Sequence, residues 1–106
     1  MATVHIVLAG ASGRSSTGAT MPVMNSVETD ADTMTSSVTS AKSAITAPAS
    51  AWAGLFWSVT ASGGNVYVKF GDDPTAVTDD GWLVLDGQTR EFAVSAASEQ
   101  CAIKDA

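Results

Sequence analysis

Residues 55–70 read Leu-Phe-Trp-Ser-Val-Thr-Ala-Ser-Gly-Gly-Asn-Val-Tyr-Val-Lys-Phe, and this stretch decides the fold class. Apolar side chains occupy every second position from Leu55 to Val59 and again from Val66 to Phe70. A period of two is the pattern of a β-strand with one buried face. Because Ser62-Gly63-Gly64-Asn65 is typical of a tight turn, the sequence predicts a β-hairpin of two strands, over residues 52–61 and 66–70.

The same pattern continues on both sides of this stretch. Residues 82–85 and 89–95 flank Asp86-Gly87, which predicts a second hairpin, and residues 99–104 form a last strand. Near the N-terminus, residues 3–8 place branched aliphatic side chains at every second position. Several short strands separated by turns predict an all-β fold, either a small antiparallel β-sandwich or a jelly-roll-like barrel.

The segment between the first strand and the predicted hairpin has a weaker pattern. Residues 10–20 are rich in Gly, Ser and Thr and show no period, which predicts a loop. Farther along, residues 33–40 and 44–47 are candidates for strands, and a helix over residues 36–47 is the competing interpretation. Dense β-branched and hydroxyl side chains disfavour that helix.

With 106 residues, the chain has room for a single domain. We expect residues 36–106 to form the β-sandwich core. Residues 1–35 are expected to add a strand, a glycine- and serine-rich loop and an acidic segment, which together form an irregular N-terminal part that serves as an arm or interface element. Because so short a chain buries a small core, self-association is a further expectation.

Charge and composition narrow the classes of partner. The chain carries a formal net charge of −6, which repels phosphate backbones and anionic lipid headgroups, so we expect neither nucleic acid nor membrane as a partner. No apolar run approaches the ~20 residues of a membrane span. The single cysteine, Cys101, cannot form an intrachain disulfide, and no basic residue precedes the short apolar stretch at residues 4–9. These features predict a protein assembled in a reducing cytoplasm.

The glycine-rich segment after the first strand invites comparison with a phosphate-binding loop. Gly13 and Gly18 have the spacing of such a loop, and Thr20 stands where the magnesium-binding hydroxyl belongs. However, Ala19 occupies the position of the lysine that contacts the phosphates. The Ser- and Thr-rich sequence that follows does not form the required amphipathic helix. We therefore interpret the segment as a surface loop.

Candidate catalytic and metal-binding residues are few. His5 is the only histidine, so a histidine cluster for zinc or a proton relay is excluded. Cys101 shares an alternation face with Ile103, which predicts a buried thiol. The acidic residues do not have the spacing of an EF-hand, and Asp and Gly also serve turns. We expect no enzyme activity, no cofactor and no metal. The acidic residues considered for calcium are Glu28, Asp30, Asp32, Asp72, Asp73, Asp79, Asp80 and Asp86.

Three aromatic side chains do not fit on the predicted core face of the strands. The alternation leaves Trp52, Phe56 and Trp82 on the opposite faces of their strands. These rings are expected either to close a second sheet, to lie in an oligomer or capsid interface, or to form a platform for sugars. The predicted core residues are Leu55, Trp57, Val59, Val66, Val68, Phe70, Phe92, Val94 and Ile103.

Four segments of the second half resemble small accessory virion proteins of tailed bacteriophages. They are residues 66–76 (Val-Tyr-Val-Lys-Phe-Gly-Asp-Asp-Pro-Thr-Ala), 82–87 (Trp-Leu-Val-Leu-Asp-Gly), 91–94 (Glu-Phe-Ala-Val) and 100–104 (Gln-Cys-Ala-Ile-Lys). The resemblance covers roughly residues 36–106, while the first ~35 residues match no pattern of that family.

The resemblance implies a β-sandwich that decorates or cements a phage capsid without chemistry of its own. Its partners would be further copies of the chain, with a trimer as a plausible arrangement, and the major capsid protein at the virion surface. The alternative is a carbohydrate- or receptor-binding module of a tail, fibre or head–tail connector.

Overall fold

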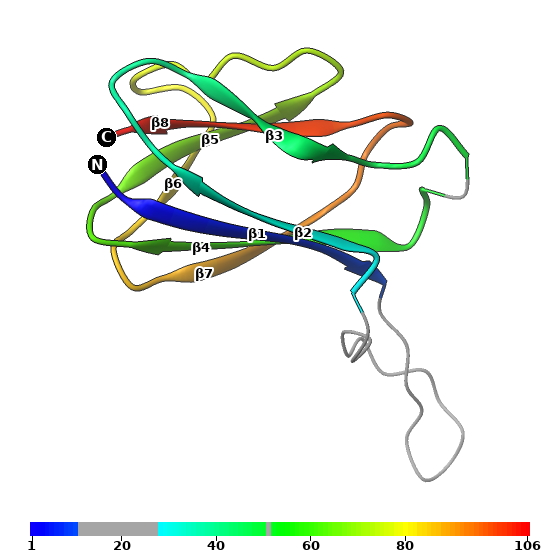
Figure 1. The fold of residues 1–106 in the computed structure, drawn as a ribbon. Coiled ribbons are helices and arrows are strands. Elements are labelled where there is room, and N and C mark those ends of the chain that lie inside the picture. Colours follow the sequence, from blue (N-terminus) through cyan, green and yellow to red (C-terminus); the bar gives the residue numbers. More distant parts are fainter. Residues whose placement is uncertain (11–27, 51) are drawn as a thin grey trace, which may run out of the picture.

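The structure, a computed structural model, describes residues 1–10, 28–50 and 52–106. These residues form two four-stranded antiparallel sheets that pack face to face as a β-sandwich, which confirms the predicted all-β fold class (Figure 1). The eight strands are β1 (Thr3–Gly10), β2 (Asp30–Thr35), β3 (Ala41–Thr46), β4 (Leu55–Ser62), β5 (Val66–Gly71), β6 (Trp82–Val84), β7 (Thr89–Ala93) and β8 (Gln100–Asp105).

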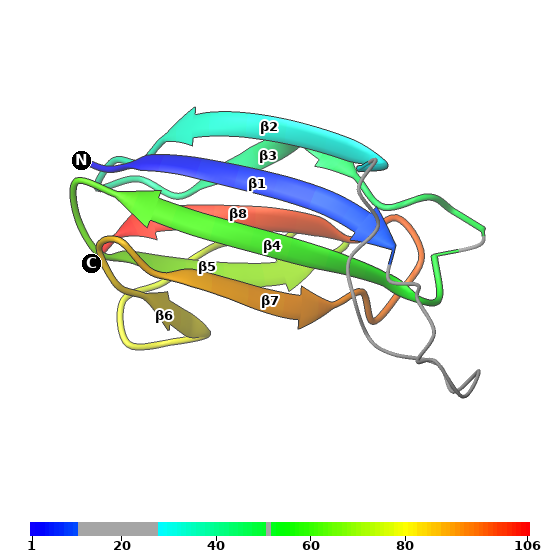
Figure 2. The same cartoon turned by 90° about the horizontal axis from the view of Figure 1, so that it is seen from below.

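The strand order is that of a circularly permuted jelly roll. The first sheet has the order β2-β1-β4-β7 (Figure 2), and the second sheet has the order β3-β8-β5-β6. When the strands are counted as a ring that starts at β2 and ends at β1, this arrangement matches the eight-stranded jelly roll. The two ends of the described chain accordingly meet, with the amino group of Met1 3.6 Å from the Asp105 carboxylate.

The predicted β4–β5 hairpin is wrong. β4 pairs with β1 and β7 in the first sheet, whereas β5 pairs with β8 and β6 in the second. The turn at residues 63–65 therefore carries the chain across the sandwich. Gly63 takes a positive φ of 95°, which a residue without Cβ adopts easily.

The second predicted hairpin is wrong for the same reason. β6 pairs with β5 and β7 pairs with β4, so Asp86-Gly87 also joins opposite sheets. The two crossing connections bind each other. The Gly63 N–H donates to Asp86 Oδ1 at 2.8 Å, and the Asp86 N–H donates to Asn65 Oδ1 at 2.8 Å. The turn residues that suggested hairpins thus connect the β4–β5 and β6–β7 turns by hydrogen bonds at one end of the sandwich.

The two strands between residues 28 and 50 have other bounds than the predicted strands at residues 33–40 and 44–47. β2 covers residues 30–35 and β3 covers residues 41–46, so the region between them crosses from one sheet to the other instead of continuing a strand to residue 40. The competing helix does not form, since residues 41–46 pair with β8. Of the predicted loop at residues 10–20, Gly10 belongs to β1 and the rest lies outside the described residues.

The core contains the residues that the alternation placed there. Val4, Ile6 and Leu8 of β1 are buried between the sheets, so this part of the N-terminal segment belongs to the core. Every predicted core residue is buried or packs against the buried cluster, which confirms the inward faces of the strands. Trp57 is the largest fully buried side chain.

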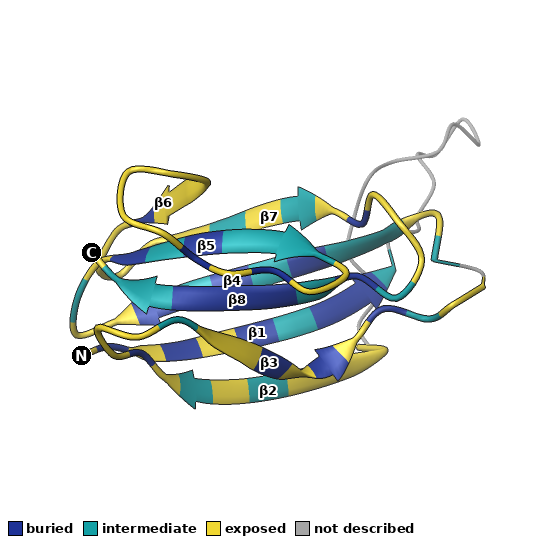
Figure 3. Ribbon diagram, turned by 90° about the horizontal axis from the view of Figure 1, so that it is seen from above, coloured by how far each residue is buried: buried dark blue, intermediate teal, exposed yellow. Residues whose placement is uncertain are grey.

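The β5–β6 connection, residues 72–81, lies over the outer face of the second sheet (Figure 3). Pro74 and Ala76 are buried, so the loop is packed down and not extended into solvent. Ala102 of β8 lies between Lys42 and Lys69 in the sheet and points to the outer face, since its neighbours along β8 point into the core. Ala102 is nevertheless fully buried. The loop of residues 72–81 therefore covers this outer face.

Four side chains of the second sheet hold this loop. Their bonds are Lys42 Nζ to Asp73 at 2.6 Å, Lys69 Nζ to Asp80 at 2.9 Å, Tyr67 Oη to Asp79 at 3.0 Å and Lys104 Nζ to Thr78 at 2.9 Å. Three of the aspartates that were considered for calcium thus serve as anchors of the loop.

Candidate functional site

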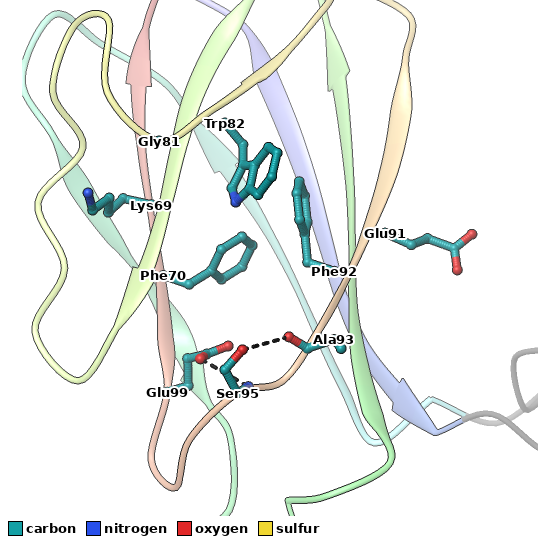
Figure 4. A pocket seen from close by; sticks show the side chains of 9 residues that line it. All are labelled: Lys69, Phe70, Gly81, Trp82, Glu91, Phe92, Ala93, Ser95 and Glu99. Atoms are coloured by element: carbon teal, nitrogen blue, oxygen red, sulfur yellow. Dashed lines mark hydrogen bonds between the residues drawn. The ribbon is translucent and has the colours of Figure 1, made fainter.

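A cleft of about 560 Å³ opens at the side of the sandwich where the edge strands β6 and β7 lie (Figure 4). It arises because β6 is short. β6 pairs with residues 66–68 of β5, so Lys69, Phe70 and Gly71 have no β6 partner. The cleft is lined by Lys69, Phe70, Gly81, Trp82, Glu91, Phe92, Ala93, Ser95 and Glu99.

A row of aromatic rings connects the core to this cleft. The ring centroids of Trp57 and Phe70 are 5.8 Å apart, those of Phe70 and Phe92 are 4.9 Å apart, and those of Phe92 and Trp82 are 5.5 Å apart. All three pairs are tilted, a geometry that aromatic quadrupoles favour. Trp57 is fully buried, whereas Trp82 at the mouth of the cleft is 50% exposed.

Arg90 holds the outer end of this row. Its guanidinium carbon lies 5.2 Å from the centroid of the Trp82 ring and 5.4 Å from that of Phe92, within cation–π range of both. Its Nη1 also donates to the Leu83 carbonyl at 3.0 Å. Because Arg90 is on β7 and Leu83 is on β6, these contacts fix the two edge strands relative to each other.

The polar end of the cleft is built around Glu99, which is only 4% exposed. Its Oε1 accepts a hydrogen bond from the Trp57 indole at 2.8 Å, and its Oε2 accepts one from the Ser95 N–H at 3.2 Å. The Ser95 hydroxyl lies beside it. Lys69 and Glu91 line the rim, but their charged groups point away from the rings (Figure 4).

The structure does not bring the three predicted interface residues together. Trp82 lies at the mouth of the cleft, Phe56 is half-buried on the outer face of the first sheet, and Trp52 is half-buried against the core. The predicted face of Trp82 is wrong, because Trp82 packs on Phe92 between the sheets and shares its side of β6 with the buried Val84.

A second feature is the outer face of the first sheet, which we call the open face. Its residues follow from the strand register and the alternation. They are Thr3, His5, Val7, Ala9, Ala31, Thr33, Thr35, Phe56, Ser58, Thr60, Ser62, Thr89, Glu91 and Ala93. All of them are exposed or half-buried except Ala9, which is buried. Among the residues that the structure describes, Glu91 and His5 are the only ionisable ones on this face. The His5 ring is hydrogen-bonded to Thr33 at 2.9 Å.

Among the described residues, the other candidate groups do not come together. Cys101 is fully buried on the core side of β8, and burial, together with the nearby Glu99 charge, raises its pKa to about 12. His5 lies on the open face of the other sheet. Across residues 1–10, 28–50 and 52–106, no three His, Cys, Asp or Glu side chains gather in a way that could hold a metal ion. The phosphate-loop residues Gly13, Gly18 and Thr20 lie outside the described residues.

Comparison with known proteins adds no relative. No family model, curated protein or solved structure matches the chain. Within the part of the chain that the structure describes, no helix has the length and apolar character to cross a bilayer. The function is therefore inferred from the cleft and the open face.

Two contributors to the cleft were missed at the level of sequence. Glu99 was assigned to the last strand, and Arg90 was counted only toward the overall charge. A partial indication exists for Arg90, since it stands two positions before Phe92 and therefore on the same side of β7. Glu99 has no comparable indication, because its partner Trp57 is distant in the chain.

Proposed function

We propose that this chain is a non-enzymatic structural protein of a tailed-phage particle, which decorates the capsid by docking its open face on the major capsid protein. The observation that carries this proposal is the near absence of charge among the described residues of that face. Although the chain has a net charge of −6, the open face holds one carboxylate, Glu91. The loop of residues 72–81 covers the corresponding face of the second sheet.

An uncharged sheet face suits a protein interface. Burying a charge costs free energy unless it is paired, and the centres of interfaces are depleted of charged residues. Thr and Ser hydroxyls can exchange hydrogen bonds with water for hydrogen bonds with a partner. Thr side chains also lose little rotamer freedom because they are already restricted at χ1. Val7 and Phe56 add apolar surface at this face.

Architecture and size agree with this proposal. The jelly roll is common among capsid proteins, although it also carries unrelated functions. A small domain gains stability when copies or partners bind its folded state. We therefore expect assembly as a homo-oligomer on the particle, with a trimer as the arrangement suggested by the resemblance.

The decisive experiment is mass spectrometry of purified particles, followed by binding of the chain to particles that lack it. Thr60→Lys places a charge near the middle of the open face, and we expect at least a tenfold loss of capsid binding, about 1.4 kcal/mol. Thr75→Lys, on the exposed part of the covering loop, is the matched control and should bind normally. Absence of the chain from intact particles, or equal binding by both variants, contradicts the proposal.

A further inference from the structure

We propose that the cleft between β6 and β7 binds neutral glycans, with a pyranose ring stacked on the indole of Trp82. This is a second function, distinct from capsid docking through the open face, although Glu91 and Ala93 of β7 border both surfaces. It rests on the exposed ring, its fixed position, the polar groups at the end of the cleft and the balance of charge around it.

The cleft has the size and lining of a small-molecule site. Its volume of about 560 Å³ lies within the range of known ligand pockets, which are mostly apolar with a few polar groups. Phe70 and Phe92 form one side of the space that Trp82 overhangs (Figure 4). The half-exposed indole presents a flat apolar surface with a polar N–H, which matches the mixed surface of a sugar ring.

Trp82 is already held in position before any ligand arrives. Phe92 packs on it at 5.5 Å between centroids, and the Arg90 guanidinium contacts the same ring at 5.2 Å. Gly81, the preceding residue, has a φ of 79° and is tightly packed, since a Cβ there would lie 2.6 Å from the Val68 carbonyl oxygen. Little side-chain freedom remains to be lost on binding, which favours affinity.

Donors and acceptors are both available inside the cleft. Glu99 uses each carboxylate oxygen once, so lone pairs remain to accept from sugar hydroxyls. Ser95 contributes a hydroxyl whose bond to the Ala93 carbonyl is long, at 3.4 Å. The Trp82 indole nitrogen points into the cleft (Figure 4), and no hydrogen bond joins it to the described residues. A polyhydroxylated ligand can satisfy all three groups.

The charges around the cleft select a neutral ligand. Glu99 lies inside it, so an anionic sugar would meet a carboxylate in a poorly solvated position. A cationic ligand would meet the like charge of the Arg90 guanidinium, which lies 5.2 Å from the centroid of the Trp82 ring. The sugar ring itself would stack on the part of the half-exposed indole that Arg90 and Phe92 leave open. A neutral glycan meets neither conflict.

The test is titration of the full chain with neutral oligosaccharides built from glucose, galactose, mannose and N-acetylhexosamines, followed through backbone and indole N–H signals in NMR. Trp82→Phe identifies the Trp82 indole signal by its disappearance. We expect one or more neutral glycans to shift that signal and those of Phe70, Phe92 and Ser95, with a dissociation constant of about 1 mM or tighter.

Three variants separate stacking from fold effects. Trp82→Ala should weaken binding at least tenfold, and Trp82→Phe, which keeps a ring, should weaken it less. Leu85→Ala removes an exposed apolar side chain beyond the end of β6 and should leave binding unchanged. Each variant is first checked for the dispersed NMR spectrum of the folded protein.

Several results overturn the inference. These are no shift with any neutral glycan, shifts confined to residues outside the cleft, or tighter binding of a sialylated than of a neutral glycan. A proline-rich peptide that occupies the cleft where glycans do not would identify a peptide site instead, and this also overturns it. The Thr60→Lys variant, which is expected to lose capsid binding, should still bind glycans. This result distinguishes failure of the glycan site from failure of the capsid proposal.

Discussion

The indole N–H of Trp57 on β4 donates to the carboxylate of Glu99, just before β8, across 2.8 Å. Trp57 is fully buried and Glu99 nearly so, and they belong to opposite halves of the sandwich. A hydrogen bond to a charged group contributes more than one between neutral groups. This pair therefore connects the two sheets at the boundary between the core and the cleft.

Trp57→Phe removes the donor and leaves a buried carboxylate oxygen without its partner. We expect a loss of about 2–4 kcal/mol in the free energy of unfolding, from the unsatisfied acceptor and the lost volume. Glu99→Gln keeps one acceptor and should lose less than Glu99→Ala. Urea denaturation measures all three. A loss below about 1 kcal/mol for Trp57→Phe contradicts this role for the pair.

Gly81→Ala and Gly87→Ala form a matched pair, since their φ angles are 79° and 78°. Both variants strain the backbone, which costs about 1 kcal/mol. At Gly81 the new Cβ also meets the Val68 carbonyl oxygen, whereas nothing lies within 4 Å at Gly87. Chemical denaturation should show the larger loss for Gly81→Ala, by at least about 1 kcal/mol. Equal losses show that β6 shifts freely to accommodate the methyl group.

Cys101 should be unreactive in the folded protein. Burial raises its pKa from 9.0 to about 12, so the thiol stays protonated when an unfolded chain would ionise it. Its contribution to stability is present below about pH 9 and is lost as the pH rises toward 12. Labelling with a thiol reagent at pH 8 should proceed at the rate of unfolding. Rapid labelling without denaturant contradicts the burial of this side chain.

The covering loop depends on the two ion pairs Lys42–Asp73 and Lys69–Asp80. Replacing both lysines with methionine should change the melting temperature little, because both pairs are exposed. Hydrogen exchange should nevertheless accelerate in residues 72–81 and at Ala102 beneath them. Unchanged exchange shows that Pro74 and Ala76 are sufficient to hold the loop.

The same ion pairs give the loop a dependence on pH. The hydrogen bond and charge of each lysine lower the pKa of Asp73 and Asp80 below the usual 3.8. A carboxyl group whose pKa is lowered by folding stabilises the folded state at pH values above its unfolded-state pKa. This stabilisation is lost as the pH falls through the folded-state pKa. Protection of the loop amides, taken relative to the intrinsic exchange rate at each pH, should therefore persist down to about pH 4 and fall below it. A loss of protection well above pH 4 contradicts the two pairs as anchors.

Apart from Trp52 and Trp82, the sequence predicted which side chains face the core, but it did not predict which strands are neighbours. Alternation identifies an inward face because each strand must bury one side. The same face is buried whether β4 and β5 pair in one sheet or face each other across the core. The Gly63-Gly64-Asn65 turn is compatible with both arrangements, so nearby residues alone could not exclude the hairpin.

The candidate site was only partly predictable. Residues 82–85 are four apolar side chains in a row, and only Val84 is fully buried, so no alternation assigned Trp82 to the inward side. Trp52 looked like a surplus ring because its strand was expected to start there, whereas β4 begins at Leu55. The role of Glu99 depends on Trp57, 42 positions away, and no local pattern connects them.

The central position of β8 has a consequence for how the chain is made. β8 lies between β3 and β5, so the second sheet cannot be completed until residues 100–105 have left the ribosome. In the described part, only β1–β2 and β5–β6 are consecutive strands that pair, and such non-local topologies fold slowly, in about milliseconds to seconds. Nascent chains therefore keep open strand edges until synthesis passes residue 105. Chains interrupted earlier are expected to be cleared by proteases, so that only complete copies accumulate.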